Sequence, residues 1–191
     1  MSPGRQAEIR RPRAALPAAE GLWGALLCDD GERIAPVSSK DLDALGVSLE
    51  EAFERALANA DALTERAPEA VRWFDLEHGR VVTCEFNDPG GAGRLLSPAA
   101  RELILQVLGA ERAFAIAPTR DALLACDAED AEGTRLLARE ARQRFDDGPF
   151  PLTPRPWLLT ADGVEAAAAP PEEPSGEQDP DAQDEAPEES P

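Results

Sequence analysis

The sequence contains a single histidine, His78, and none of the short motifs that mark the common enzyme classes. A hydrolytic site of the nucleophile–base type needs a base that titrates near neutral pH beside its nucleophile. His78 falls at the tip of a predicted turn, where we expect a solvent-exposed side chain. The patterns of phosphate-binding loops, zinc proteases and serine hydrolases are missing as well. The sequence therefore predicts no catalytic residue and no cofactor.

Basic residues are scarce, because 19 Lys and Arg stand against 38 Asp and Glu, which gives a formal net charge of -19. Nucleic acids and anionic membrane surfaces both attract proteins through clustered cations. The composition thus argues against nucleic-acid binding and against membrane binding. Ten of the acids and none of the bases follow residue 164, so about half of the excess charge belongs to the last part of the chain.

Long hydrophobic runs are absent too, since no segment reaches the roughly 18 to 20 apolar residues that a membrane-spanning helix needs. Four arginines near the N-terminus are followed by an apolar patch, which raises the alternative of an export signal. Pro12 and Pro17 interrupt that segment, and Glu20 lies where its apolar part should be unbroken. We therefore interpret residues 1–20 as a flexible arm.

Only three cysteines occur, Cys28, Cys84 and Cys126, and no two of them form a C-x-x-C pair. An odd number at wide spacing fits free thiols in a reducing compartment better than a disulfide framework. Each lies in an apolar segment, where a reduced cysteine behaves as a small hydrophobic side chain. We expect three buried thiols and a cytoplasmic protein. The acidic pairs, such as Asp146-Asp147, lack the spacing of a calcium loop, so no metal site is predicted.

What the sequence does contain is a series of amphipathic segments separated by turn residues. The apolar runs at 22–28 and 33–37 predict a first hairpin whose first strand is central in its sheet. A short helix at 40–45 follows. Ser48 then forms a capping box with Glu51, which marks the start of a long helix. Five residues at helical spacing should form its buried stripe: Phe53, Ala56, Leu57, Ala60 and Leu63.

The clearest hairpin joins the runs at 71–76 and 81–86 through a short connection that contains glycine. Both runs are rich in the β-branched and aromatic residues that favour strands. Trp73 and Phe74 should point to opposite faces of the sheet. We therefore expect a helix to cover at least one of them.

The stretch from residue 93 to residue 126 predicts a helix followed by a hairpin, and the other segments can pack around this unit. Ser97 caps the helix, and the proline after it suits the first helical position. Gly109 ends the helix. The strands at 113–117 and 123–126 follow, separated by a four-residue turn that includes Arg120 and Asp121.

Asp130 predicts the cap of a third long helix, whose four arginines should form a solvated face. Residues 149–160 carry four prolines, which confine them to an edge strand or an extended strap. Residues 165–191 are mostly Ala, Pro, Glu, Asp and Gln, and predict a disordered acidic tail. We thus expect one α+β domain at 21–164, with a mostly antiparallel sheet of about six or seven strands built from hairpins and covered by three helices.

One group of residues suggests a binding site at one end of this domain. The start of the helix at Ser97 offers free amides and a partial positive charge. Arg94 precedes it, and Arg120 and Asp121 lie in the turn of the next hairpin. If these residues converge, they would receive an anion or a carboxylate. The alternative is that the two arginines only pair with local acids such as Asp88 and Asp121.

Two segments also resemble a known family. They are LLSPAARELILQVLG followed by FAIAPTRDALLACD, and the upstream DLDALGVSLEEAFERALANA. Their leucine pair ahead of Pro98 and their strand that ends at Pro118 before Arg120 are similar to the YtpQ-like family of uncharacterised bacterial proteins. The resemblance covers roughly residues 22–159. It implies an α+β fold of this element order and lends no activity.

We therefore expect a non-enzymatic protein-interaction or regulatory module of the cytoplasm. It would bind a partner through an edge of the sheet or through the end that carries Arg94 and Arg120. The alternative is a small-molecule or anion-binding enzyme with its site near Ser97. The acidic tail either attracts a basic partner or keeps the chain soluble. The oligomeric state stays open.

Overall fold

The computed structural model describes residues 15–29, 32–85, 91–168 and 170 of the 191-residue chain. A six-stranded sheet in the order β10-β9-β7-β8-β6-β5 forms its centre, and all neighbouring strands in it are antiparallel. The α+β class and the antiparallel sheet are therefore confirmed. The strands are β5 (Val71–Leu76), β6 (Gly79–Glu85), β7 (Ala113–Thr119), β8 (Ala122–Asp127), β9 (Pro156–Leu159) and β10 (Val164–Ala166).

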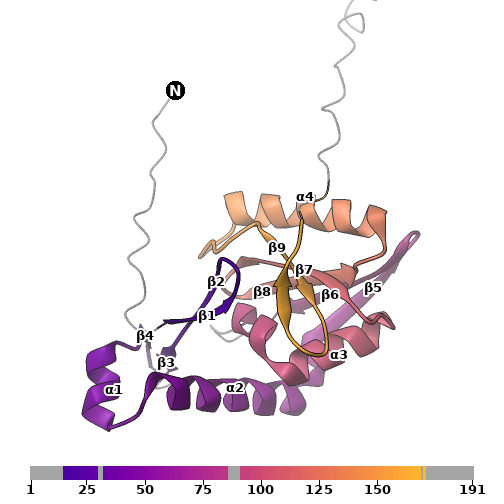
Figure 1. Cartoon of the computed structure of the whole chain (residues 1–191). Helices are drawn as coiled ribbons and strands as arrows, with labels where there is room; N and C mark the ends of the chain where they lie inside the picture. The colour runs from indigo at the N-terminus through magenta and orange to yellow at the C-terminus, as the bar shows by residue number, and fades with distance from the viewer. Residues whose placement is uncertain (1–14, 30–31, 86–90, 169, 171–191) are drawn as a thin grey trace, which may run out of the picture.

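Helices lie on both faces of this sheet (Figure 1). α4 (Ala131–Asp147) covers one face, and α3 (Pro98–Leu108) covers the other. α2 (Leu49–Arg66) packs against α3 and so lies one layer farther from the sheet. The remaining helical segments are α1 (Ser39–Leu45) and the 3-10 helices η1 (Pro68–Ala70) and η2 (Gly91–Leu96).

The sheet separates two hydrophobic cores, one beneath each helix. On the α4 side the core contains large residues of the sheet and small or aliphatic residues of the helix: Phe114, Ile116, Leu124, Cys126, Leu137 and Ala141. On the α3 side, the alternating alanines of β7 make a shallow surface on which Ile104 and Leu105 pack. All seven residues of β7 are buried, because strands flank it on both sides and helices cover both faces. A strand buried on both faces reads as a nearly continuous apolar run, and β7 is apolar at every position except Thr119.

The N-terminal region differs from its prediction. Residues 15–19, expected in a flexible arm, form strand β1 (Ala15–Ala19), which pairs with β2 (Leu22–Ala25). Gly21 lies in the intervening turn with φ +74°, a conformation that suits glycine. Residues 1–14 of the predicted arm lie outside the described part.

The predicted first strand at 22–28 is divided in two. Its second half, β3 (Leu27–Asp29), pairs with β4 (Ile34–Pro36) in a separate two-stranded sheet. Leu26 stands at the break, and its side chain is buried against Leu42 of α1. The chain turns between the two small sheets at this buried leucine. Neither half joins the central sheet, so the predicted central position of this strand is wrong.

The C-terminal part of the domain also differs. The proline-rich segment 149–160 was expected to form an edge strand or an extended strap, yet its strand β9 lies inside the sheet between β7 and β10. β10 then carries the sheet to Ala166, beyond the predicted boundary at residue 164. The predicted disorder of the acidic tail concerns mainly residues 171–191, which lie outside the described part.

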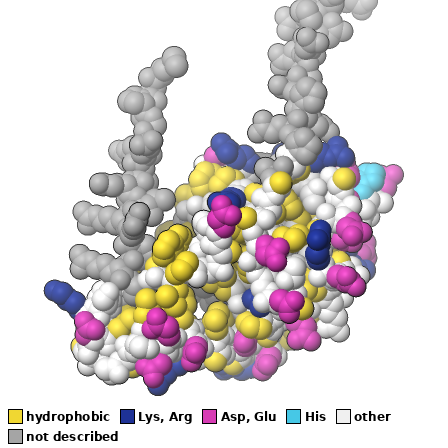
Figure 2. Space-filling model, in the orientation of Figure 1, with side chains coloured by type: hydrophobic (Ala, Val, Ile, Leu, Met, Phe, Trp, Pro, Cys, Tyr) yellow, Lys and Arg dark blue, Asp and Glu magenta, His cyan; other side chains and the backbone are white. Residues whose placement is uncertain are grey.

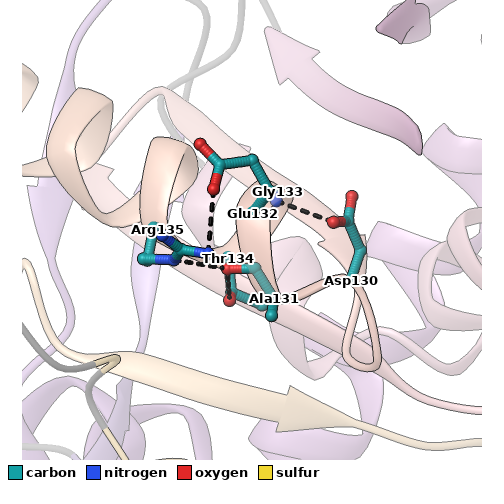
Figure 3. Close-up of polar contacts among 6 residues, drawn as sticks. All are labelled: Asp130, Ala131, Glu132, Gly133, Thr134 and Arg135. Carbon is teal, nitrogen blue, oxygen red and sulfur yellow. Dashed lines mark hydrogen bonds and ion pairs between the residues drawn. The ribbon is translucent and has the colours of Figure 1, made fainter. Parts of the chain in front are cut away.

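The capping signals identified in the sequence are correct. Ser48 and Glu51 form the reciprocal capping box of α2. Asp130 caps α4, because its Oδ1 accepts a hydrogen bond of 2.8 Å from the amide of Gly133 (Figure 3). The arginines of this helix form a charged outer surface as predicted, and three of them pair with Glu or Asp three or four residues away.

Replacement of Asp130 by Ala should lower the free energy of unfolding by about 1 kcal/mol, because the amide of Gly133 loses its acceptor. Asp130→Asn keeps a side-chain oxygen at the same place and should lose less than half as much. Urea denaturation of the two variants and the parent measures the difference. Equal losses in both variants would show that the hydrogen bond is not the source of the effect.

The cysteines do not share one environment. Burial raises the pKa of Cys84 and of Cys126 to about 12. Cys28, in β3, is exposed, so the prediction of three buried thiols is wrong at this position. All residues of β3 and β4 are exposed, so Cys28 lies in a small hairpin outside the main sheet whose side chains contact solvent.

Ellman's reagent at pH 8 should therefore react rapidly with one thiol per chain. At that pH, a thiol with a pKa near 12 is only about one part in ten thousand thiolate, the reactive form. The other two thiols should react after unfolding in urea. Cys28→Ser should abolish the rapid phase, and a rapid phase that persists in this variant would contradict the assignment.

Candidate functional site

The predicted anion site at the start of α3 holds a carboxylate of the chain itself. Ser97 caps the helix by accepting a 3.2 Å hydrogen bond from the amide of Ala100. Its hydroxyl donates to Asp61 Oδ1 of α2 at 2.5 Å, and the amide of Ala99 donates to the same oxygen at 3.1 Å. The positive end of the helix dipole stabilises a negative charge in this position. Asp61 therefore joins α2 to α3 through the anion-binding capacity of the helix terminus.

Arg94 also lies in a contact of α2, the one between α2 and η2. It belongs to η2 and is only 3% exposed. Its Nε donates a 3.3 Å hydrogen bond to Oγ1 of Thr64 in α2. The hydroxyl of Thr64 in turn donates to the carbonyl of Ala60 at 2.9 Å. Arg94 is thus a buried residue of the interhelical contact.

Thr64 explains one wrong prediction about α2. Leu63 was expected in the buried stripe, but it is 43% exposed, whereas Thr64 is buried. The face that α2 turns inward is apolar at Phe53 and becomes polar toward its C-terminal half, at Asp61 and Thr64. A stripe chosen by hydrophobicity alone therefore selects Leu63 in place of Thr64.

Arg101 is a further polar residue of this contact, and no pattern in the sequence indicates its role. It lies in the first turns of α3, is 7% exposed, and donates from Nη1 to the carbonyl of Leu96 at 2.7 Å. Burial lowers its pKa, and the nearby charge of Asp61 opposes that shift. Within the described part of the chain, its Nε has no hydrogen-bond partner.

Arg120 and Asp121 form the two-residue turn between β7 and β8, shorter than the four-residue turn expected. The guanidinium of Arg120 donates to both oxygens of Asp121, at 2.8 and 3.2 Å. This bonding raises the pKa of Arg120. The guanidinium also lies 3.9 Å from the ring centroid of Phe150, a cation–π distance. Phe150 has φ 52°, which is a strained backbone conformation for a large residue.

The backbone of the segment that carries Arg94 lies next to the turn that carries Arg120, but the two arginine side chains have different partners. The amide of Ala92, in η2, donates to the carbonyl of Arg120 at 2.8 Å. Arg94 then extends to Thr64, and Arg120 extends to Asp121 and Phe150. The pairing of Arg120 with Asp121 is the local alternative considered for the sequence, and Asp88 lies outside the described residues. The assignment of these residues as a binding site stays a prediction.

A second candidate lies at the edge of the sheet. β5 is an end strand, and five of its six residues are exposed. Trp73 and Phe74 are 52% and 56% exposed, so the helix cover expected for one of them is largely missing. Register places Trp73 opposite Val82 on the α3 face, and Phe74 opposite Val81 on the α4 face. The strand therefore presents aromatic side chains on both faces.

An open groove borders β5 on the α3 face. It has a volume of about 490 Å³ and lies between Val71 and Trp73 of β5 and Leu103, Gln106 and Val107 of α3. Pro68, Glu69 and Arg80 complete its lining. Arg80 is fixed by a 2.7 Å hydrogen bond to Asp75 and by another of 2.7 Å to the carbonyl of Val107. The groove combines apolar walls with a strand edge that pairs with no other strand among the described residues.

The sequence showed the residues of this edge but not their exposure. The β-branched and aromatic residues of 71–76 indicate a strand, but they do not reveal which neighbour the strand lacks. Only the order of the strands in the sheet makes β5 terminal. Trp73 and Phe74 are consequently surface residues.

Comparison with family models, curated proteins and solved structures finds no match for this chain. The resemblance to the YtpQ-like family therefore stays a prediction. In the described part of the chain, no helix is long and apolar enough to cross a membrane. Among the same residues, no three His, Cys, Asp or Glu side chains are grouped to hold a metal ion.

The contact between η2 and the β7–β8 turn can be tested at Gly91. A Cβ atom added there would lie 2.7 Å from the carbonyl oxygen of Asp121 and 2.9 Å from its carbonyl carbon. Because both are backbone atoms, Gly91→Ala should lower the free energy of unfolding by about 1–3 kcal/mol.

Gly93 supplies the matched control, since a Cβ added there meets nothing within 4 Å. Gly93→Ala should change the free energy of unfolding by less than about 0.5 kcal/mol. Thermal or urea denaturation of both variants checks the pair. Similar values for the two variants would contradict the close approach of η2 to the turn.

Proposed function

We propose that this chain is a non-enzymatic protein-interaction module of the cytoplasm and that it binds partner chains along β5. The observation that carries the proposal is the exposure of Trp73, Phe74 and Leu76 on a strand edge that no strand of the described ranges pairs with. An edge strand presents unpaired amide and carbonyl groups, which an extended segment of another chain can satisfy. Exposed aromatic residues add the buried area on which interface energies depend.

The two ends of the sheet support this interpretation by their difference. β10, at one end, has three residues, and such short edges resist unwanted pairing. β5, at the other end, has six residues and carries large apolar side chains beside its charges. A long apolar edge promotes aggregation unless something covers it. A partner that pairs with β5 would provide that cover.

The polar residues near Ser97 support a structural role more than a catalytic one. Asp61 engages Ser97 and the α3 amides, Thr64 accepts from Arg94, and Asp121 holds Arg120. The first two contacts join α2 to α3 and to η2, and the third lies within the β7–β8 turn. The alternative of an anion-binding enzyme at this end has no comparable observation in its favour.

The proposal can be tested by photo-crosslinking in cells. The full chain would carry benzoylphenylalanine at Phe74, with the same residue at Arg139 as control. Arg139 is exposed on α4, a helix that packs on β6, β7 and β8. We expect adducts of defined mass at position 74 only. A supporting result also needs slower amide exchange of β5 in the purified complex.

Adducts of equal yield at positions 74 and 139 would overturn the proposal, because they would reflect collision with neighbouring proteins. The absence of any adduct at position 74 would do so as well.

A further inference from the structure

We infer that the segment bound along β5 is an extended basic peptide with an apolar side chain two residues from a Lys or Arg. This inference rests on the proposed function of β5 and adds the chemistry of the partner. It follows from the lining of the groove, the state of its charges and the period of a strand.

The groove provides the apolar part of the recognition. Val71 and Trp73 lie on the same face of β5, because alternate residues of a strand share a face. Across from them stand Leu103 and Val107 of α3. A strand added to β5 would direct every second side chain toward this space. An apolar side chain of the partner would there bury surface of Trp73 that is now exposed.

The charges of the groove select the sign of the partner. Arg80 already interacts with Asp75 and with the carbonyl of Val107, so its charge is compensated within the chain. Glu69 is exposed at the same groove, and among the described residues no hydrogen bond or ion pair engages its carboxylate. The groove therefore presents one uncompensated negative charge, which a Lys or Arg of the partner would meet.

The charge of the wider surface also favours a basic partner. Acidic side chains spread over most of the face drawn in Figure 2, whereas Lys and Arg lie near α4 and at scattered places below it. With a net charge of -19, the chain repels acidic segments and attracts basic ones at distances up to the screening length, about 8 Å at physiological salt. The same repulsion disfavours pairing of β5 with a second copy of this chain.

Two synthetic peptides test the inference with the full chain. The first is acetyl-Val-Leu-Val-Lys-Val-Lys-amide, which places Leu and Lys on one face and Val on the other. The second carries Glu in place of both Lys. We expect the lysine peptide to slow amide exchange across Val71–Leu76 and to bind at least about fivefold more tightly than the glutamate peptide. Added salt should reduce that preference.

Glu69→Gln should weaken binding of the lysine peptide about two- to fivefold, the range of an exposed ion pair. Glu50→Gln removes the same charge from the first turn of α2, about 25 Å from the other end of that helix, and should leave the affinity unchanged. Trp73→Ala should weaken the binding of both peptides. Circular dichroism confirms that each variant is folded.

The outcomes separate the two proposals. Equal protection of β5 by both peptides would overturn the inference of a basic partner and leave β5 as a docking edge. Protection of β5 by neither peptide at millimolar concentration would overturn both. The inference also fails if the chain alone is a dimer by light scattering and becomes monomeric in both Trp73→Glu and Phe74→Glu, because the occupant would then be a second copy.

Discussion

The structure depends on the antiparallel pairing of β7 with β8. The residues of β7 are buried on both faces, so each face of the sheet must be covered, and α3 and α4 provide that cover. Backbone amides in such a strand have no water to bond with and must pair with neighbouring strands. β9 and β8 satisfy them on the two sides. This central requirement leaves β5 and β10 as the edges, and only β5 is long enough to receive a partner along six residues.

The layer outside α3 is held by a different kind of interaction. α2 meets α3 and η2 through Asp61, Thr64, Ser97, Arg94 and Arg101, in place of a continuous apolar seam. Buried polar groups stabilise little in total, because desolvation opposes their attraction, but they demand defined geometry. The contact thus specifies how α2 lies on the domain. It also uses the helix terminus that would otherwise attract an external anion.

The sequence predicted well those features that are encoded within a few neighbouring residues. Ser48 with Glu51, Ser97 with its proline, and Asp130 each placed a helix start, because a cap is a contact between residues three apart. The hairpins at β5–β6 and β7–β8 were likewise encoded by their turns. Predictions failed where the structure depends on a contact with a residue that is distant in the sequence. The run at 22–28 is interrupted at Leu26, which is buried against Leu42. Asp61 accepts its hydrogen bond from Ser97 only because α3 packs against α2. The exposure of Trp73 depends on which strand ends the sheet.

The sheet also divides the buried cysteines between its two faces. Cys84 belongs to the core beneath α3, and Cys126 belongs to the core beneath α4. Each core therefore contains one thiol that is shielded only while its own helix stays in place. If α4 detaches while α3 remains, Cys126 becomes reactive first, and the opposite movement releases Cys84. The chain thus carries a natural pair of probes that distinguishes local opening of one layer from global unfolding.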